Sequence, residues 1–295
     1  MDGIVRSTTA LTTLVVGMVL SVTAATAQNV GYVGLTFGYN DAEDPADNDR
    51  DSSTSVTLDG AYAYSFGSGN TLVFEGSYRN DNYDLNIINN REIEPQYQFG
   101  LHYLRDLNSG LKAGGFLSYG MAPHSGLNED YKVGLIGIET IYDTNRKFVL
   151  FGQLAYGDSF DNPDNSTQSS FGFHRGKVLR AGAIYTGFGK TDISLELEYG
   201  TSISYEDSDE PGRFYSVALG GETQLSANSN WVANYEIRYA YFDAKTDPDD
   251  IDETSINIGF RYLFGARKSS GLAKAGIIGL PYTPLRASVW TPKMD

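Results

Sequence analysis

Alternation of apolar with polar or small residues runs along nearly the whole chain after its first 27 residues. The segments 32–39, 58–66, 97–103 and 231–241 show this alternation most clearly. A period of two places successive side chains on opposite faces of an extended backbone, so each segment predicts a β-strand with one apolar face. The fold class that follows is all-β.

Three stretches alternate less regularly: Leu111–Ala122, Asp130–Asp143 and Lys177–Thr186. We assign them as strands too, because the strands beside them need hydrogen-bonding partners. Five short connections rich in Gly, Asn and Ser have the composition of hairpin turns and cover 67–70, 106–110, 143–146, 187–191 and 226–230. Six long polar connections lie between them and cover 41–52, 80–94, 123–129, 158–171, 206–212 and 245–253.

This rhythm of short turns and long loops predicts an antiparallel barrel of about twelve strands that crosses a membrane. Each long connection holds one proline, with Pro95 at the edge of its strand, and no proline interrupts a proposed strand. That placement suits a closed sheet, in which every strand donates hydrogen bonds to two neighbours. A soluble β-sandwich or β-propeller is the alternative, but its strands are usually shorter and its connections need not alternate in length.

The N-terminus has the pattern of a secretory signal peptide over residues 1–27. Its apolar run Ala10–Leu20 is too short to span a bilayer, and Ala25–Ala27 fits the small-x-small cleavage pattern, which leaves Gln28 as the mature start. A retained anchor is the alternative. We therefore divide the chain into a signal peptide (1–27), a barrel (28–264) and a basic C-terminal tail (265–295).

Composition excludes several functions. The chain has no cysteine, which removes disulfides and thiolate metal sites, and it has only three histidines. Its net charge of −15 argues against nucleic-acid binding, which needs basic patches. In Asp47-x-Asp49-x-Asp51, an EF-hand-like start, Ser52 and Leu58 occupy positions where calcium loops need glycine and glutamate. We expect no cofactor and no metal site.

The octet Asn257–Phe264 resembles the terminal-strand signal of bacterial outer-membrane β-barrels, through Gly259, Tyr262 and Phe264. With the signal peptide and the strand rhythm, the chain resembles the porin-like channel superfamily of these barrels. The resemblance implies a bacterial outer-membrane location, short periplasmic turns and long acidic extracellular loops. It implies contact with outer-membrane lipids and lipopolysaccharide, and recognition by the barrel assembly machinery. The chain departs from the pattern because 31 residues follow Phe264.

In each strand, the residues that alternate with the apolar ones form a polar face. This face carries the candidate functional residues and is expected to point inwards, because charged side chains at this density cannot face lipid. The candidate pore-lining residues are Asp59, Glu75, His102, Glu139, Arg180, Glu196, Glu198, Glu222, Glu236, Arg238 and Arg261. Glu139 belongs to a strand of ambiguous phase. Glycines share the inward phase and leave space, namely Gly34, Gly38, Gly100, Gly114, Gly120 and Gly259. Two interpretations follow: a narrow polar pore, or an interior sealed by arginine–carboxylate pairs.

We predict a passive channel for small polar solutes or cations, since seven acidic side chains of this set face three arginines. One alternative is an outer-membrane lipid hydrolase of the phospholipase or lipid A-modifying type. However, His124 and Ser125 sit together in a loop, His174 lacks an orienting acid and His102 stands alone, so no catalytic residues are assigned. A second alternative is a structural barrel that binds partners through its loops or tail.

The tail 265–295 carries five basic residues against one acidic residue, a net charge of +4. With an even number of strands, it begins in the periplasm. Three placements are open: the tail hangs free, contacts the cell wall, or folds back into the acidic lumen. Its segment Ala273–Tyr282 is apolar enough to pack against another surface.

Overall fold

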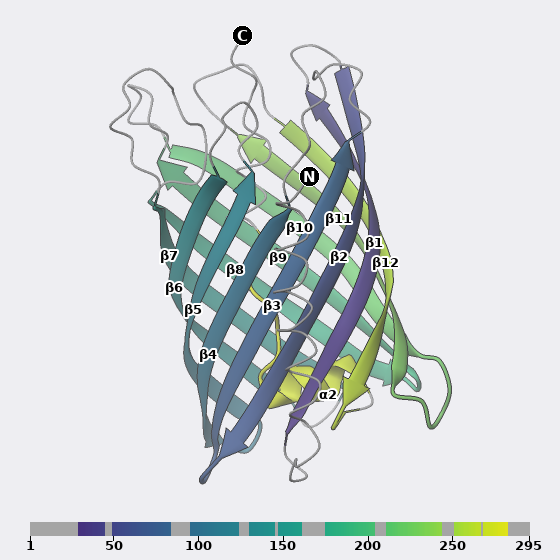
Figure 1. Ribbon diagram of the computed structural model, residues 1–295. Coiled ribbons are helices and arrows are strands. Elements are labelled where there is room, and N and C mark those ends of the chain that lie inside the picture. Colours follow the sequence, from purple (N-terminus) through teal and green to yellow (C-terminus); the bar gives the residue numbers. More distant parts are fainter. Residues whose placement is uncertain are drawn as a thin grey trace, which may run out of the picture.

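The computed structural model describes residues 29–44, 49–83, 95–123, 130–144, 147–160, 175–203, 211–243, 251–266 and 268–282. These residues form twelve strands and one short helix (Figure 1). The elements are β1 (Val30–Asp44), β2 (Asp49–Phe66), β3 (Asn70–Tyr83), β4 (Gln96–Asn108), β5 (Leu111–Pro123), β6 (Asp130–Asp143), β7 (Phe148–Ser159), β8 (Gly176–Phe188), β9 (Thr191–Ile203), β10 (Pro211–Gln224), β11 (Trp231–Asp243), β12 (Ile251–Phe264) and α2 (Ser269–Ala275). The expected signal peptide lies outside the described residues.

Each strand pairs antiparallel with its neighbours in sequence, and β1 pairs with β12 to close the barrel. The closing register places Gly31 opposite Phe264 and Glu43 opposite Asp252. The predicted all-β barrel is therefore confirmed, and the three less regular stretches are β5, β6 and β8. Within the described residues, no helix is long and apolar enough to cross a membrane.

The strands reach further into the predicted long connections than the alternation indicated. The first long connection, 41–52, was predicted as loop, but β1 runs to Asp44 and β2 begins at Asp49. Register pairs these two residues directly. Asp49 and Asp51 therefore lie in an extended strand rather than in the compact loop that an EF-hand requires. Pro123 and Pro211 are the terminal residues of β5 and β10, where a missing N–H is tolerated.

The outer face of the barrel is apolar, as the alternation predicts. Large side chains such as Phe37, Ile138 and Leu197 are exposed there. Aromatic pairs gather towards both ends of the strands: Tyr78 contacts Tyr97 near a long connection, and Trp231 contacts Tyr262 near a short turn. These positions fit the two aromatic girdles expected of a membrane barrel.

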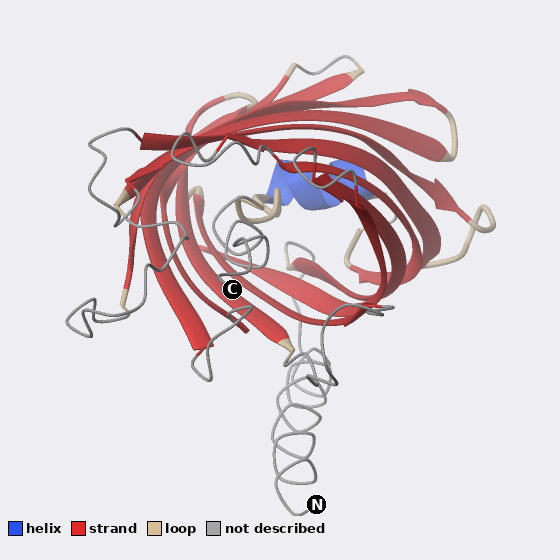
Figure 2. Cartoon of the chain, turned by 90° about the horizontal axis from the view of Figure 1, so that it is seen from above, coloured by secondary structure: helices blue, strands red, loops and turns tan. Residues whose placement is uncertain are grey.

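The inner face has an apolar cluster around Phe116, Val133 and Leu135 and a larger apolar region near the short turns, and α2 lies inside the barrel at the end with the short turns (Figures 1 and 2). A ring of inward side chains from nine strands surrounds α2: Val30, Ala61, Ala63, Val73, Leu104, Ile141, Val149, Ile184, Val232 and Leu263. Leu272, Ala273, Ile277 and Ile278 pack against this apolar ring. Of the three placements considered for the tail, residues 268–282 fold back into the lumen.

We predict that the short turns face the periplasm and the long connections face outwards. Single cysteines at Asp49, Asp209 and Asp249 should be labelled by an impermeant maleimide on intact cells, whereas one at Ser68, in the β2–β3 turn, should not. The chain has no native cysteine, so labelling reports the new site alone. Labelling at Ser68 only would show that the barrel is inserted in the opposite direction.

The terminal aromatic Phe264 should be needed for assembly. Its ring lies over Gly31 across the closing seam and contacts Tyr62 at 6.2 Å between ring centroids. Phe264→Ala should lower the heat-modifiable folded fraction in the outer membrane, because it removes both the seam contact and the last residue of the proposed assembly signal. Phe260→Ala, on the outer face of the same strand, is the control and should assemble nearly normally. Equal yields for the two variants would contradict this role.

Candidate functional site in the barrel lumen

The candidate pore-lining residues all lie on the inner wall of the barrel. Seven of them are buried: His102, Glu139, Arg180, Glu196, Glu198, Glu222 and Arg238. Asp59, Glu75, Glu236 and Arg261 are partly exposed. The ambiguous phase of Glu139 is resolved, since this side chain is 1% exposed while Ile136 and Ile138 on the same strand face outwards.

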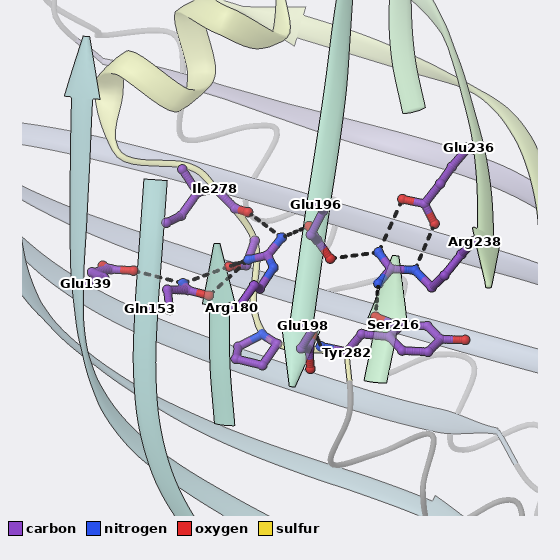
Figure 3. A network of polar contacts seen from close by, with 12 residues as sticks. Glu139, Gln153, Arg180, Glu196, Glu198, Ser216, Glu236, Arg238, Ile278 and Tyr282 are labelled. Atoms are coloured by element: carbon purple, nitrogen blue, oxygen red, sulfur yellow. Dashed lines mark hydrogen bonds and ion pairs between the residues drawn. The ribbon is translucent and has the colours of Figure 1, made fainter. Parts of the chain in front are cut away.

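Two arginines share one carboxylate at the centre of the lumen (Figure 3). Glu196 on β9 accepts hydrogen bonds from Arg180 at 2.5 Å and from Arg238 at 2.8 Å. Arg238 also donates to Glu236 at 3.2 Å and to the Ser216 hydroxyl at 3.1 Å. These bonds link β8, β9, β10 and β11 across the inner wall.

A second cluster forms around Arg261 on β12. Its guanidinium donates to Glu222 at 2.6 Å and to Asp59 at 3.0 Å, and it lies 4.5 Å from the centre of the Tyr32 ring. All three inward arginines of the predicted set are therefore paired. The arginine–carboxylate pairs that a sealed interior would need are therefore present. The alternation of the sequence alone did not show whether these pairs form.

His102 belongs to a third cluster. Its Nδ1 lies 2.9 Å from Glu139 and its Nε2 lies 3.7 Å from Glu75, while its ring stacks on Phe116 at 5.4 Å. The partners of His102 are thus carboxylates, and among the described residues no serine hydroxyl bonds to it. His124 and His174 lie outside the described residues. Within the described chain, no group of three or more His, Asp or Glu side chains could hold a metal ion.

The space expected beside the inward glycines Gly34, Gly38 and Gly100 is occupied by side chains. A side chain at Gly34 would meet Asp59 and Arg261, and one at Gly38 would meet Ser55 and Asn257. At Gly100 the space is taken by Leu280 of the tail. Gly100 thus admits a tail residue and does not widen the lumen.

The tail segment after α2 crosses the charged part of the lumen. Arg180 donates to the carbonyl oxygens of Gly279 at 2.8 Å and Ile278 at 3.0 Å, and Gln153 donates to Gly279 at 3.0 Å (Figure 3). In the other direction, the N–H of Gly279 donates to Glu75 at 3.3 Å. Side chains of the inner wall therefore bond to both the N–H groups and the carbonyl oxygens of this segment.

Tyr282 ends the described part of the tail in a polar and aromatic setting. Its N–H donates to Glu198 at 3.1 Å and its hydroxyl donates to Glu253 at 3.2 Å. The guanidinium of Arg238 lies 4.5 Å from the centre of its ring, a cation–π distance. The segment thus touches side chains from β3 round to β12.

Charged contacts also hold α2 at the end with the short turns. Asp192 accepts from the N–H of Ser270 at 3.0 Å and from the Ser269 hydroxyl at 3.2 Å. Lys274 pairs with Asp143 at 2.9 Å. Lys268 lies 3.9 Å from Asp192 and donates to the carbonyl oxygen of Gly189.

Sequence reasoning missed the tail-binding residues Asp143, Asp192 and Glu253, as well as the apolar ring. A signal for the ring is present in the sequence. Val73 and Leu104 stand on the inward phase, two residues from Glu75 and His102 respectively, towards the short turns. Apolar residues on both phases of a strand indicate that both faces are covered, here by lipid and by the tail.

No protein-family model and no curated protein matches this sequence. Solved structures share the fold. An outer-membrane channel from Pseudomonas putida F1 has a TM-score of 0.60 at 10% identity, over 81% of this chain and 97% of that chain. The CymD monoaromatic hydrocarbon channel has a TM-score of 0.50 at 8% identity, over 81% and 90%. The NanC porin has a TM-score of 0.48 at 12% identity, over 78% and 98%.

This chain has the fold of the bacterial outer-membrane β-barrels. The resemblance stated from the terminal octet and the strand rhythm is confirmed at that level. The Pseudomonas putida F1 structure is an outer-membrane channel, so its fold supports the expected outer-membrane location. At such low sequence identities, the structural similarity indicates a shared fold and does not identify a substrate.

Glu196 should be the most sensitive carboxylate of the lumen. Glu196→Gln removes the shared charge between Arg180 and Arg238, and breaking a buried ion pair costs about 3–5 kcal/mol. We expect a lower urea midpoint for unfolding of the protein in detergent. The matched control is Glu236→Gln, which also contacts Arg238, but through a side chain that is 35% exposed. A similar loss in both variants would show that burial of Glu196 does not set its contribution.

Proposed function

We propose that this barrel is an outer-membrane channel for small polar solutes or cations, and that its C-terminal segment closes the lumen in the state described here. The observation that carries the proposal is the charged inner wall at mid-depth. The predicted pore-lining set holds seven acidic side chains and three arginines, an excess of four acidic groups. A wall of this kind suits water and ions rather than a permanent apolar filling.

Energetics favour this interpretation over a purely structural barrel. Buried ion pairs contribute little to stability compared with well-packed apolar residues, so stability alone does not explain their use here. The Arg261 cluster also holds buried polar atoms without a hydrogen-bond partner among the described residues: Oδ1 of Asp59, Oε2 of Glu222 and Nε of Arg261. Such atoms are normally satisfied by water or a ligand, which supports a lumen that admits polar solutes.

The closing segment has the properties of a removable plug. It is held by hydrogen bonds, by two lysine–carboxylate pairs and by packing of α2 against the apolar ring. Lys274 is 44% exposed in its pair with Asp143, so water and salt can compete for that contact. These non-covalent contacts support a plug that leaves the lumen when its anchors are weakened.

Removing the plug should open the channel. A chain that ends at Ala266 keeps all twelve strands, and in planar bilayers it should conduct more than the full-length protein. The reversal potential in a salt gradient should report cation preference, because the predicted pore-lining set holds seven carboxylates and three arginines. Anion preference, or a folded barrel without current, would contradict the proposed function.

A reversible lock provides the control for this experiment. Leu280 Cγ lies 3.1 Å from the position of a Cβ on Gly100, so the sulfur of a cysteine at position 280 would lie beside the Cβ of a cysteine at position 100, within reach of a disulfide. The full-length variant Gly100→Cys/Leu280→Cys should stay closed when oxidised, under any condition that opens the wild type. Reduction should restore wild-type currents. Equal currents before and after reduction, with the disulfide verified by mass spectrometry, would show that movement of this segment does not gate the barrel.

A further inference from the structure

The tail segment 276–282 is held in the lumen largely through its main chain. Carbonyl oxygens of Ile278, Gly279 and Pro281 accept hydrogen bonds from wall side chains, and the N–H groups of Gly279 and Tyr282 donate to wall carboxylates. Main-chain groups are common to all peptides. We propose that the lumen contains a peptide-binding site, occupied here by residues 276–282 of the same chain, which also binds short peptides supplied in trans.

The site is most complete around Gly279. Its N–H meets Glu75, and its carbonyl oxygen meets both Arg180 and Gln153. A peptide unit with donor and acceptor both paired can leave water without the cost of an unsatisfied group. A bare inorganic ion has no such combination of N–H and carbonyl groups, so a peptide is the ligand class that fits this wall.

The wall groups that contact the segment are also held by the barrel itself. Arg180 is fixed by Glu196 at 2.5 Å and by the Gln153 side-chain oxygen at 2.9 Å. Gln153 in turn donates to Glu139 at 3.0 Å. Because these contacts do not involve the tail, the donors remain in position when the segment leaves. A preorganised site loses little entropy on binding, which favours capture of a separate peptide.

Two side-chain positions add selectivity. Leu280 fills the space that Gly100 leaves on β4. Tyr282 lies against Arg238 and has its ring centre 6.4 Å from that of Phe214, and its hydroxyl reaches Glu253. Gly279 has φ +79°, a conformation that other residues rarely adopt. The preferred peptide therefore carries glycine, then an aliphatic residue, then an aromatic residue two positions later.

The same chain competes with any free peptide. A tethered segment acts at an effective concentration in the millimolar range, so the intact protein should bind little added peptide. The site must be vacated before it can be tested. Gly276 and Gly279 offer a way to do this within the full chain, since both have positive φ and Gly276 packs against Leu104. Gly276→Val/Gly279→Val should release the segment and leave every wall residue unchanged.

The test measures fluorescence anisotropy of a labelled heptapeptide, Gly-Ile-Ile-Gly-Leu-Pro-Tyr, with folded protein in detergent. The full-length Gly276→Val/Gly279→Val variant should bind it at least about tenfold more tightly than the wild type. A second form that ends at Ala275 keeps α2 and all twelve strands, and its site is necessarily vacant. Absence of binding to both folded forms would overturn the proposal.

Matched controls separate specific binding from partition into the micelle. N-methylation of Gly279 in the peptide removes the donor to Glu75 and should weaken binding about tenfold, whereas N-methylation of Ile278 should not. In the wall, Arg180→Lys should weaken binding similarly, while Arg79→Lys, at an inward arginine that pairs with Asp81, should not. Equal loss of binding for the two N-methylated peptides, or for the two arginine variants, would also overturn the proposed peptide site. Because binding is read without a membrane current, a failed peptide site and a failed channel give different results.

Discussion

Pairing of β1 with β12 is the interaction on which the rest of this structure depends. It removes the two free edges of the sheet, so every strand bonds to two neighbours and the backbone can lie in lipid. Closure also divides each strand into two environments. Side chains such as Ile138 turn to the hydrocarbon, while Glu139, one residue later, is confined to a narrow lumen. The lumen has little room, so its charges have to meet one another or a bound segment.

The inner wall is lined differently near the short turns and at mid-depth. Near the short turns the wall is apolar, and α2 covers it with Leu272 and Ala273. At mid-depth the wall is charged, and an irregular segment with exposed main-chain groups is bound there by Arg180 and Gln153. The order of the tail matches the order of the wall: a helix lies in the apolar ring, and a segment whose N–H and carbonyl groups bond to wall side chains follows in the charged part.

The sequence was sufficient for the barrel because a period of two and the turn lengths are local properties. The alternation and the turn lengths located β11 and β12, predicted the closed sheet and placed the side chains of Arg238 and Arg261 on its inner face. The extension of β2 to Asp49 was missed because pairing with β1, rather than the local composition, keeps these polar residues extended. Filling of the space at Gly100 by Leu280 was missed for a similar reason, since the two residues are 180 positions apart and their contact depends on the closed sheet. A glycine in a strand indicates a close approach, but not the partner that approaches.

The balance of contacts explains why the tail can be both ordered and releasable. The Arg180–Glu196 and Arg238–Glu196 pairs are buried within the wall, and breaking them would leave charges in a low dielectric. The tail makes contacts of another kind. Its main-chain groups can exchange the wall for water at small net cost, and its Lys274–Asp143 pair is partly exposed and is screened by salt. Loss of the tail therefore leaves the ion pairs of the wall intact, and the apolar ring is the surface that then meets water. Burial of that ring by α2 is a separate contact, so residues 276–282 can leave the charged site while α2 stays in place.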